Sequence, residues 1–268
     1  MHSQRLAPGV IPAGVPNVAA LSQSERTDAA RVWAQRAAEE RIAGQAMHEL
    51  ATALSGEPLS EGYQWLATRA AQDELQHAEL CRGLAQVYAG CDLPCPLIQT
   101  GRSRTPDKVL TAFEHICVRE SLQGAVFRVA REYATDAAVL RTLSTLVDDE
   151  NEHAELGWEL VATLSNPERV RLSHCASALV ASVVQRFAEE LAELPLAGVP
   201  EHGCPEAELI GAVACDVLAE VVWPGMERAG LDASPSARWV ADHGQQLLLG
   251  ASLGGVVSSR RPRIQPAL

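Results

Sequence analysis

The sequence predicts an all-α protein, a four-helix bundle with one long crossover connection and further helices packed on the bundle. Long stretches rich in Ala, Leu, Glu and Gln, which are good helix formers, lie between short breaks that contain Gly or Pro. No sustained stretch alternates apolar and polar positions with the β-branched residues typical of strands. The length of 268 residues and the hydrophobic content of 47% are sufficient for a globular protein with a real core.

The overall charge argues against one class of function. The chain carries 34 acidic and 22 basic side chains, which gives a formal net charge of −12. Contacts to phosphate groups require clustered Lys and Arg, so we expect no nucleic-acid-binding face. The one basic cluster consists of Arg260, Arg261 and Arg263, and we interpret it as a solvated tail rather than a binding arm.

Cysteine usage and the lack of an apolar leader predict a soluble, cytoplasmic protein. Seven cysteines, an odd number without the spacing of a small disulfide framework, indicate reduced thiols. Cys91 and Cys95 form a lone CxxxC pair, for which metal or redox use stays an alternative. The N-terminal residues contain Pro and Gly where a secretory signal has an unbroken apolar core. No later segment has about 20 uninterrupted apolar residues, so we expect no membrane contact.

Caps and helix breakers divide the chain into three parts. Residues 1–23 are punctuated by Pro and Gly and are predicted to be irregular, lying over the folded body. Residues 24–165 are predicted to form the four-helix bundle, and residues 166–268 a C-terminal helical extension. The predicted helices of the bundle are Ser24 to Leu54, Ser60 to Ala89, a third that opens at Thr105-Pro106, and a fourth from Asp136 to before Asn166-Pro167.

The lengths of the connections predict the topology of the bundle. The links near residues 55–60 and 134–136 are short, so the helices that they join should be antiparallel neighbours. The link from Gly90 to Arg104 is long and could span roughly 45–50 Å when extended. A helix of about 29 residues is only ~43 Å long. The third helix can therefore run parallel to the second after a long crossover.

The C-terminal extension is predicted to contain three more helices. They span about 168–193, 206–228 with a kink at Pro224, and 236–249 after Ser234-Pro235. These helices carry no motif of their own. We expect them to pack along the bundle as a lid or wall rather than to fold as an independent domain.

Two nearly identical octads carry the chemistry. DELQHAEL runs from Asp73 to Leu80, and DENEHAEL runs from Asp149 to Leu156. Each octad places a Glu three residues before a His, so both side chains lie on one helix face, one turn apart. The midpoints of the four predicted helices fall near Glu40, Glu74 to His77, Glu120, and Glu150 to His153.

Heptad spacing directs these residues into the bundle. Glu40 is the single charge in an apolar stripe from Trp33 to Leu54, whereas Glu39 belongs to a more polar row. Four carboxylates that face one another in a low-dielectric core repel strongly, and two divalent metal ions with two imidazole ligands would neutralise them. The alternative, four surface Glu and two satisfied His, requires all four helices to turn polar residues inward. The predicted metal ligands, which we also expect to be catalytic, are Glu40, Glu74, His77, Glu120, Glu150 and His153.

The remaining acidic residues of the octads have different predicted roles. Asp73 and Asp149 are placed to accept a hydrogen bond from the ligand His of the opposing octad, with solvated surface residues as the alternative. Glu79 and Glu155 point away from the ligand row and should face solvent. Small residues near the metal level, Gly44, Gly124 and Gly157, either leave room for a ligand or allow close helix packing.

The complete set, Glu40, Glu74-x-x-His77, Glu120 and Glu150-x-x-His153, resembles the ferritin-like di-iron carboxylate superfamily over about residues 25–165. The stretch from Ile116 to Val161 is similar to the second hairpin of the aldehyde-deformylating oxygenases, and the layout resembles bacterial ferritin-like domain proteins. This resemblance implies a ferritin-like bundle with two iron ions, manganese being an alternative, bridged by carboxylates and reacting with O2 or peroxide.

The chain departs from several relatives of this type. Rubrerythrins carry a four-Cys rubredoxin module that these cysteines cannot form. Storage ferritins end soon after the fourth helix or one short helix, whereas residues 166–268 follow the fourth helix here. Some relatives have a further Glu at the position of Ala125, so we expect no third metal-binding carboxylate there.

Three functions remain open on these residues. The first is a di-iron oxidoreductase that activates O2 or peroxide to oxidise a small organic substrate, with an external electron donor as a possible partner. The second is metal handling without an organic substrate: ferroxidase, peroxidase or manganese-catalase-like work. The third is a structural bundle tied by metal. An apolar tunnel to the metals would favour the first, and a narrow polar channel with a carboxylate-lined mouth the second. The sequence leaves open the substrate, the donor and whether the chain forms a homodimer.

Overall fold

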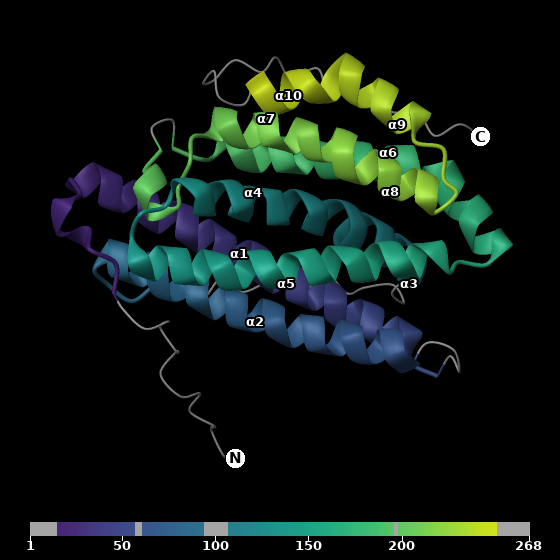
Figure 1. Ribbon diagram of the computed structural model, residues 1–268, viewed down its shortest axis with the longest axis horizontal. Coiled ribbons are helices and arrows are strands. Elements are labelled where there is room, and N and C mark those ends of the chain that lie inside the picture. Colours follow the sequence, from purple (N-terminus) through teal and green to yellow (C-terminus); the bar gives the residue numbers. More distant parts are fainter. Residues whose placement is uncertain (1–14, 57–60, 94–106, 196–197, 251–268) are drawn as a thin grey trace.

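The computed structural model describes residues 15–56, 61–93, 107–195 and 198–250. All regular structure among these residues is helical, and their one β-bridge, between Val199 and Cys204, is isolated. The predicted all-α class is therefore confirmed. The helices lie in roughly aligned layers (Figure 1).

The first hairpin consists of α1 (Gln23–Leu54) and α2 (Glu61–Ala89), which pack along their length. The prediction that Ser24 caps α1 is wrong, because the cap is Ser22. The Ser22 hydroxyl accepts a hydrogen bond from the Glu25 amide, while the Glu25 carboxylate accepts one from the Ser22 amide. This reciprocal capping box satisfies two amides at the start of the helix and sets its first residue.

The second hairpin begins with a continuous helical run of α3 (Lys108–Thr111), the π-helical η2 (Ala112–Arg119) and α4 (Glu120–Tyr133). Its cap is Asp107, whose carboxylate accepts hydrogen bonds from the amides of residues 109 and 110. The predicted opening at Thr105-Pro106 lies outside the described residues. The partner helix α5 (Ala137–Ala162) is capped by Asp136, as the sequence predicts.

The two hairpins pack on each other, two further helices pack on the second hairpin, and the last described helices pack on those two. Helix α2 contacts α5, and α1 contacts α3 and η2. Helix α6 (Asn166–Ala192) lies against α3 and η2, and α7 (Ala207–Val217) lies against α4. The last described elements are η4 (Leu218–Val222), α8 (Trp223–Arg228), α9 (Ser234–Trp239), η5 (Val240–Gly244) and α10 (Gln245–Gly250).

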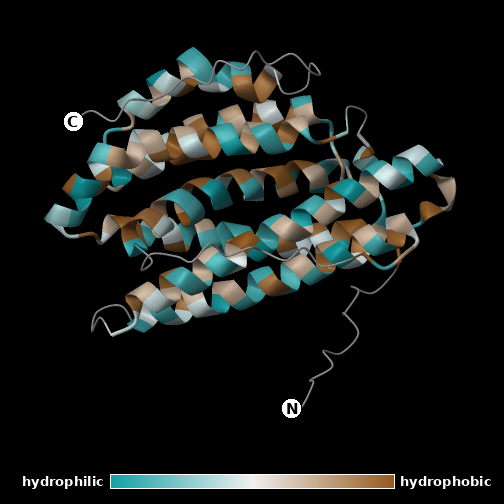
Figure 2. Cartoon of the chain, turned by 180° about the vertical axis from the view of Figure 1, so that it is seen from behind, coloured by the Kyte–Doolittle hydropathy of each residue, from teal (hydrophilic) through white to brown (hydrophobic). Residues whose placement is uncertain are grey.

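One cluster of buried side chains joins the bundle to the C-terminal helices. It includes Met47 from α1, Phe113 from η2, Leu160 from α5, Val184 from α6 and Met226 from α8. Hydrophobic and hydrophilic residues are interspersed along the helices in the view from behind (Figure 2). The C-terminal helices therefore share a core with the bundle and cover its second hairpin.

Several expectations concern parts of the chain at or beyond the edges of the described residues. Most of the predicted long crossover, together with Cys95, falls in 94–106, and the basic tail falls in 251–268, so both lie outside them. Within the predicted irregular N-terminal segment, Val18–Ala20 forms a single 3₁₀ turn, η1. The Asn17 amide donates a hydrogen bond of 2.9 Å to Asp136, which attaches this segment to the start of α5.

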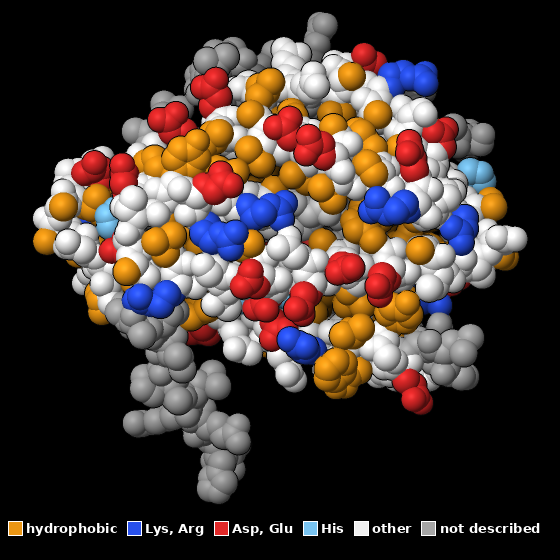
Figure 3. All heavy atoms as spheres, viewed as in Figure 1, with side chains coloured by type: hydrophobic (Ala, Val, Ile, Leu, Met, Phe, Trp, Pro, Cys, Tyr) orange, Lys and Arg blue, Asp and Glu red, His pale blue; other side chains and the backbone are white. Residues whose placement is uncertain are grey.

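One helical segment of the described residues, Ala207–Arg228, is long and apolar enough to cross a membrane, with a mean hydropathy of 1.6. Core helices of soluble proteins meet the same criteria. Here 44% of the apolar window is buried, α7 contacts α4, α6 and α10, and Asp216 and Glu220 interrupt the apolar run. The face seen in Figure 3 carries acidic and basic side chains mixed with apolar ones.

Candidate metal centre

The six predicted ligands meet in the interior between the two hairpins. Glu40 comes from α1, Glu74 and His77 from α2, Glu120 is the first residue of α4, and the last two come from α5. None of the six is more than 5% exposed. Amphipathic helices normally bury apolar stripes, so six polar side chains at one level of four helices mark a site rather than core packing.

The ligand atoms form two overlapping groups. In each group the candidate ligand atoms lie within 4.8 Å of one another, a spacing that allows them to hold a metal ion. Glu74 and Glu150 belong to both groups. The first group consists of Glu40, Glu74, His77 and Glu150, and the second of Glu74, Glu120, Glu150 and His153.

Seven buried atoms of this centre have no hydrogen-bond partner among the described residues. They are Glu40 Oε2, both carboxylate oxygens of Glu74 and of Glu150, His77 Nδ1 and His153 Nδ1. His153 Nδ1 lies 2.6 Å from Glu74 Oε1 without hydrogen-bond geometry, and His77 Nδ1 lies 3.3 Å from Glu40 Oε2. Each unsatisfied buried group costs about 1–3 kcal/mol. A cation between these atoms would satisfy all of them, so the residues fit a metal.

The carboxylates are not stable together as anions without a counter-charge. Burial, and then the charge of Glu40, raise the pKa of Glu74 well above its usual value. Burial, and then the charges of Glu74 and Glu120, do the same to the pKa of Glu150. Burial raises the pKa of Glu120 to about 7. For Glu40, contact with His77 outweighs burial and the pKa is lowered. The centre therefore takes up either protons or a metal.

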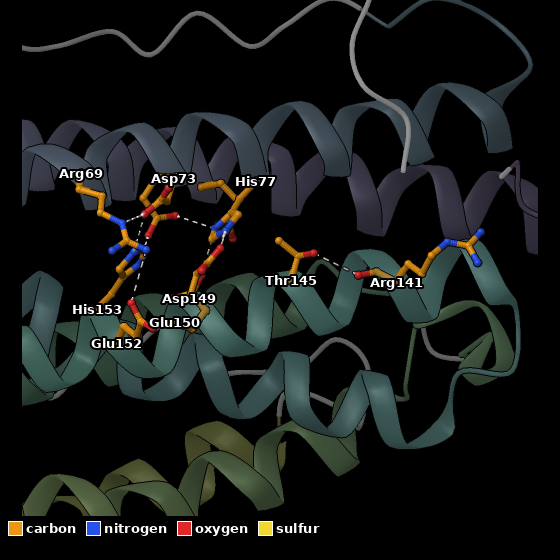
Figure 4. Close-up of polar contacts among 11 residues, drawn as sticks. Arg69, Asp73, His77, Arg141, Thr145, Asp149, Glu150, Glu152 and His153 are labelled. Carbon is orange, nitrogen blue, oxygen red and sulfur yellow. Dashed lines mark hydrogen bonds and ion pairs between the residues drawn. The ribbon is translucent and has the colours of Figure 1, made fainter. Parts of the chain in front are cut away.

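The two octads contact each other crosswise through their Asp and His residues (Figure 4). His77 Nε2 lies 2.9 Å from Asp149 Oδ2, a hydrogen bond from α2 to α5. His153 Nε2 lies 3.8 Å from Asp73 Oδ2, which is an ion-pair distance. Each ring thus turns Nδ1 toward the carboxylates and Nε2 toward an Asp. This orientation suits Nδ1 as the metal ligand and Nε2–H as the donor to the Asp.

Two neighbours of the centre were missed by the sequence reasoning. Gln123 is 6% exposed, and its Nε2 lies 3.3 Å from both Glu40 Oε1 and Glu39 Oε2. Gln123 follows Glu120 by three residues, so its position on the same helix face was a usable signal. Glu39, assigned to a polar row, also accepts a hydrogen bond from Gln35 and lies 3.8 Å from Arg119.

The glycines near the metal level allow the helices to approach closely. A Cβ at Gly44 would lie 3.1 Å from the Cβ of Glu74, and a Cβ at Gly124 would lie 3.2 Å from the Cβ of Glu150. At Gly157 a Cβ would lie 2.9 Å from Ile116. Of the two interpretations left open, room for a ligand or close packing, the structure favours close packing at all three positions.

Two cavities reach the centre. The first, of about 230 Å³, touches Glu40 and Glu120 and is lined by side chains of α1, η2, α4 and α6. The second, of about 140 Å³, lies between α2 and α5 beside His153. Charged and polar side chains line the first, among them Glu39, His115, Arg119, Gln123, Arg186 and Glu190. The charged side chains of the second are Arg69, Asp73, Glu152, Glu155 and Glu159.

Chemically, the centre offers carboxylate and imidazole ligands in an enclosed position with two polar approaches. Mixed carboxylate and imidazole sets bind first-row transition metals such as iron and manganese. The buried cluster of Glu and His residues can therefore hold metal. Comparison of the chain with protein-family models, with curated proteins and with solved structures gave no match.

Proposed function

We propose that this chain is a ferritin-like di-iron oxidoreductase that activates O2 or peroxide and oxidises a small organic substrate. One observation carries the proposal: two ligand groups overlap at Glu74 and Glu150, so a pair of ions side by side would share these two carboxylates. Four carboxylates match the charge of two divalent ions, and the two imidazoles supply one nitrogen ligand for each ion.

Within this proposal each ligand has a position. Glu40 and His77 would hold one ion, Glu120 and His153 would hold the other, and Glu74 and Glu150, which belong to both groups, would contribute to both. Two iron ions, or manganese in their place, would supply redox chemistry toward O2 or peroxide, with electrons from an external donor.

The surrounding residues orient the ligands and exclude water. Asp149 accepts the Nε2–H hydrogen bond of His77 and so directs Nδ1 at the metal position. Gln123 donates toward Glu40 Oε1 and limits the orientations of that carboxylate. With its ligands at most 5% exposed, the centre is separated from bulk water, which protects reactive species from side reactions.

The cavity beside Glu40 and Glu120 is the proposed substrate site. Its volume of about 230 Å³ exceeds an engineered cavity of about 150 Å³ that binds benzene, so it suits a small molecule. Its lining combines polar side chains, among them His115, Arg119 and Gln123, with the apolar Ile42 and Ala43, so it suits a small substrate that has both polar and apolar parts.

One observation favours the second candidate, metal handling without an organic substrate. The cavity beside His153 is lined by four carboxylates, those of Asp73, Glu152, Glu155 and Glu159, and a mouth of this kind attracts cations. In that case the centre would oxidise ferrous ions or decompose peroxide, and the cavity beside Glu40 would admit only the oxidant.

The proposal is tested by reconstituting the purified chain with ferrous iron without oxygen, counting bound ions, and then adding O2 or peroxide. We expect about two ions per chain and consumption of the oxidant, because the ligands form two groups. Glu150→Gln should bind at most one ion, while Glu155→Gln, on the exposed side of the same octad, should bind two. One ion or none in the unmodified chain would contradict the proposal. Oxidant consumption without any organic oxidation product across small substrates that have polar and apolar parts would favour metal handling.

A further inference from the structure

The two halves of the centre hold their histidines differently. His77 Nε2 and Asp149 Oδ2 form a hydrogen bond of 2.9 Å, whereas His153 Nε2 and Asp73 Oδ2 are 3.8 Å apart. Hydrogen bonds between nitrogen and oxygen rarely exceed about 3.2 Å, so only the first contact fixes a ring. The octads that place these residues are nearly identical, so the neighbours of each Asp are the next place to look for the cause of the difference.

The difference follows from a competing cation on α2. Arg69 Nε lies 3.6 Å from Asp73 Oδ2, the same oxygen that faces His153, and Arg69 also lies 3.8 Å from Glu152 on α5 (Figure 4). Asp73 thus lies between Arg69 and His153, and at these two distances it forms a close hydrogen bond with neither of them. Arg69 is half exposed, so solvent can reach this arrangement.

The second octad has no such competitor at the matching position. Arg69 precedes Asp73 by four residues, and the residue four before Asp149 is Thr145. The Thr145 hydroxyl donates to the backbone oxygen of Arg141 on its own helix, 3.3 Å away. Asp149 therefore faces His77 without an arginine one turn earlier, and this difference between Arg69 and Thr145 matches the asymmetry of the two contacts.

Access to the two halves is unequal as well. The cavity of about 140 Å³ between α2 and α5 is lined by Arg69, Asp73, Glu152 and His153, but not by His77. The His77 side chain is 1% exposed, against 6% for His153. Solvent therefore approaches the centre on the His153 side at the place where the ring is least firmly held.

We infer that the two metal positions are unequal: the ion at His77 is held tightly, and the ion at His153 enters and leaves past Asp73 and Arg69. This inference rests on the proposed dinuclear centre. Arg69 acts as a positioning residue through Asp73, because it weakens the hydrogen bond that would otherwise orient His153. The acidic lining of the cavity supplies the field that draws divalent cations to this opening.

The repeats provide their own exchange experiment, Arg69→Thr and Thr145→Arg, at two exposed helix positions. Protein loaded anaerobically with ferrous ions is mixed with an excess of a coloured ferrous chelator, and the release of iron is followed over time. We expect two phases of about one ion each. Outer contacts to a ligand histidine typically change metal affinity by 10–100-fold. Arg69→Thr should therefore slow the fast phase about 10-fold, and Thr145→Arg should accelerate the slow phase by a similar factor.

Arg31→Thr serves as the matched control, since Arg31 is an exposed arginine paired with Asp28 on α1. It removes the same charge and should leave both phases unchanged. The inference would be overturned if both ions left in one phase, or if Arg69→Thr and Thr145→Arg left the release rates unchanged. Neither result would contradict the proposed dinuclear centre. Fewer than two ions bound in the unmodified chain would instead overturn the proposed function itself.

Discussion

At the residue scale, orientation of the histidines matters as much as the presence of the ligands. A ring that can rotate offers Nδ1 to the metal only part of the time, whereas a hydrogen bond at Nε2 fixes both its tautomer and its direction. The 2.9 Å contact between His77 and Asp149 is the clearest such bond in the centre. Asp149 also carries a lowered pKa, mainly because of this hydrogen bond, so it remains an acceptor at neutral pH.

Replacing Asp149 with Ala should weaken metal binding by about 10–100-fold without loss of helix, because the ligands themselves remain. Anaerobic titration with ferrous iron measures the affinity, and far-ultraviolet circular dichroism measures the helix content. Asp148→Ala is the control, since Asp148 is the exposed neighbour of Asp149 and its described ion pair is with Arg131, away from the ligands. An unchanged affinity in Asp149→Ala would show that this carboxylate has no part in metal binding.

At the element scale, each hairpin combines a Glu on one helix with a glycine one turn later. Glu40 precedes Gly44 and Glu120 precedes Gly124 by four residues, and each glycine faces the Cβ of Glu74 or Glu150 on the partner helix. The glycines thereby set the distance between the helices at the level of the metals. At a fixed metal geometry a displacement of a few tenths of an ångström changes ligand distances directly.

Gly124→Ala should therefore weaken metal binding and lower stability, although alanine is the better helix former by about 1 kcal/mol. The added Cβ would lie 3.2 Å from the Cβ of Glu150, so α4 and α5 must separate. Denaturant midpoints and metal titration measure the two effects. Gly62→Ala, where nothing lies within 4 Å, should be neutral or stabilising. Equal stabilisation by both substitutions would contradict the proposed packing role.

The order of the helices of the bundle and the grouping of the six Glu and His side chains could be predicted from the sequence because both depend on local spacing. A Glu three residues before a His lies on the same helix face whatever the tertiary structure. The start of α1 was predicted wrongly because Ser22 and Ser24 are both capping residues. Glu25, three residues after Ser22, completes a capping box that Ser24 lacks, and this pattern was a usable signal in the sequence. The asymmetry at Arg69 was beyond reach, because it depends on distances between α2 and α5.

At the scale of the whole molecule, the centre places charge in the core that both hairpins share. The pKa values of Glu74, Glu150 and Glu120 are raised by burial. The pKa of His77 is raised to about 12, because the hydrogen bond that it donates to Asp149 and the neighbouring carboxylates outweigh burial. The folded, metal-free protein thus binds more protons than the unfolded chain at neutral pH. A metal ion must displace these protons, so metal binding and folding are linked through pH.

The sign of this linkage gives a prediction for the metal-free protein between pH 6.5 and 8. Groups with a raised folded pKa contribute stability at low pH and lose it as the pH rises through the folded value. His153, whose folded pKa is lowered, has the opposite effect on stability, but mainly at pH values below the unfolded pKa of histidine, near 6.5. The free energy of unfolding should therefore fall, by about 1.4 kcal/mol per pH unit for each extra proton that the folded state holds.

Added metal should reverse this trend. More of the ligands are deprotonated as the pH rises, so the folded protein binds the metal more tightly. Urea unfolding at pH 6.5 and pH 8, with and without a divalent ion, measures both slopes. Glu74→Gln with Glu150→Gln removes two carboxylates that hold protons, so its metal-free slope should be flatter and its response to metal largely lost. The double substitution of Glu79 and Glu155, which lie at the solvent-facing end of each octad, should retain both slopes. A metal-free protein that becomes more stable from pH 6.5 to pH 8 would contradict the view that buried, protonated carboxylates occupy its core.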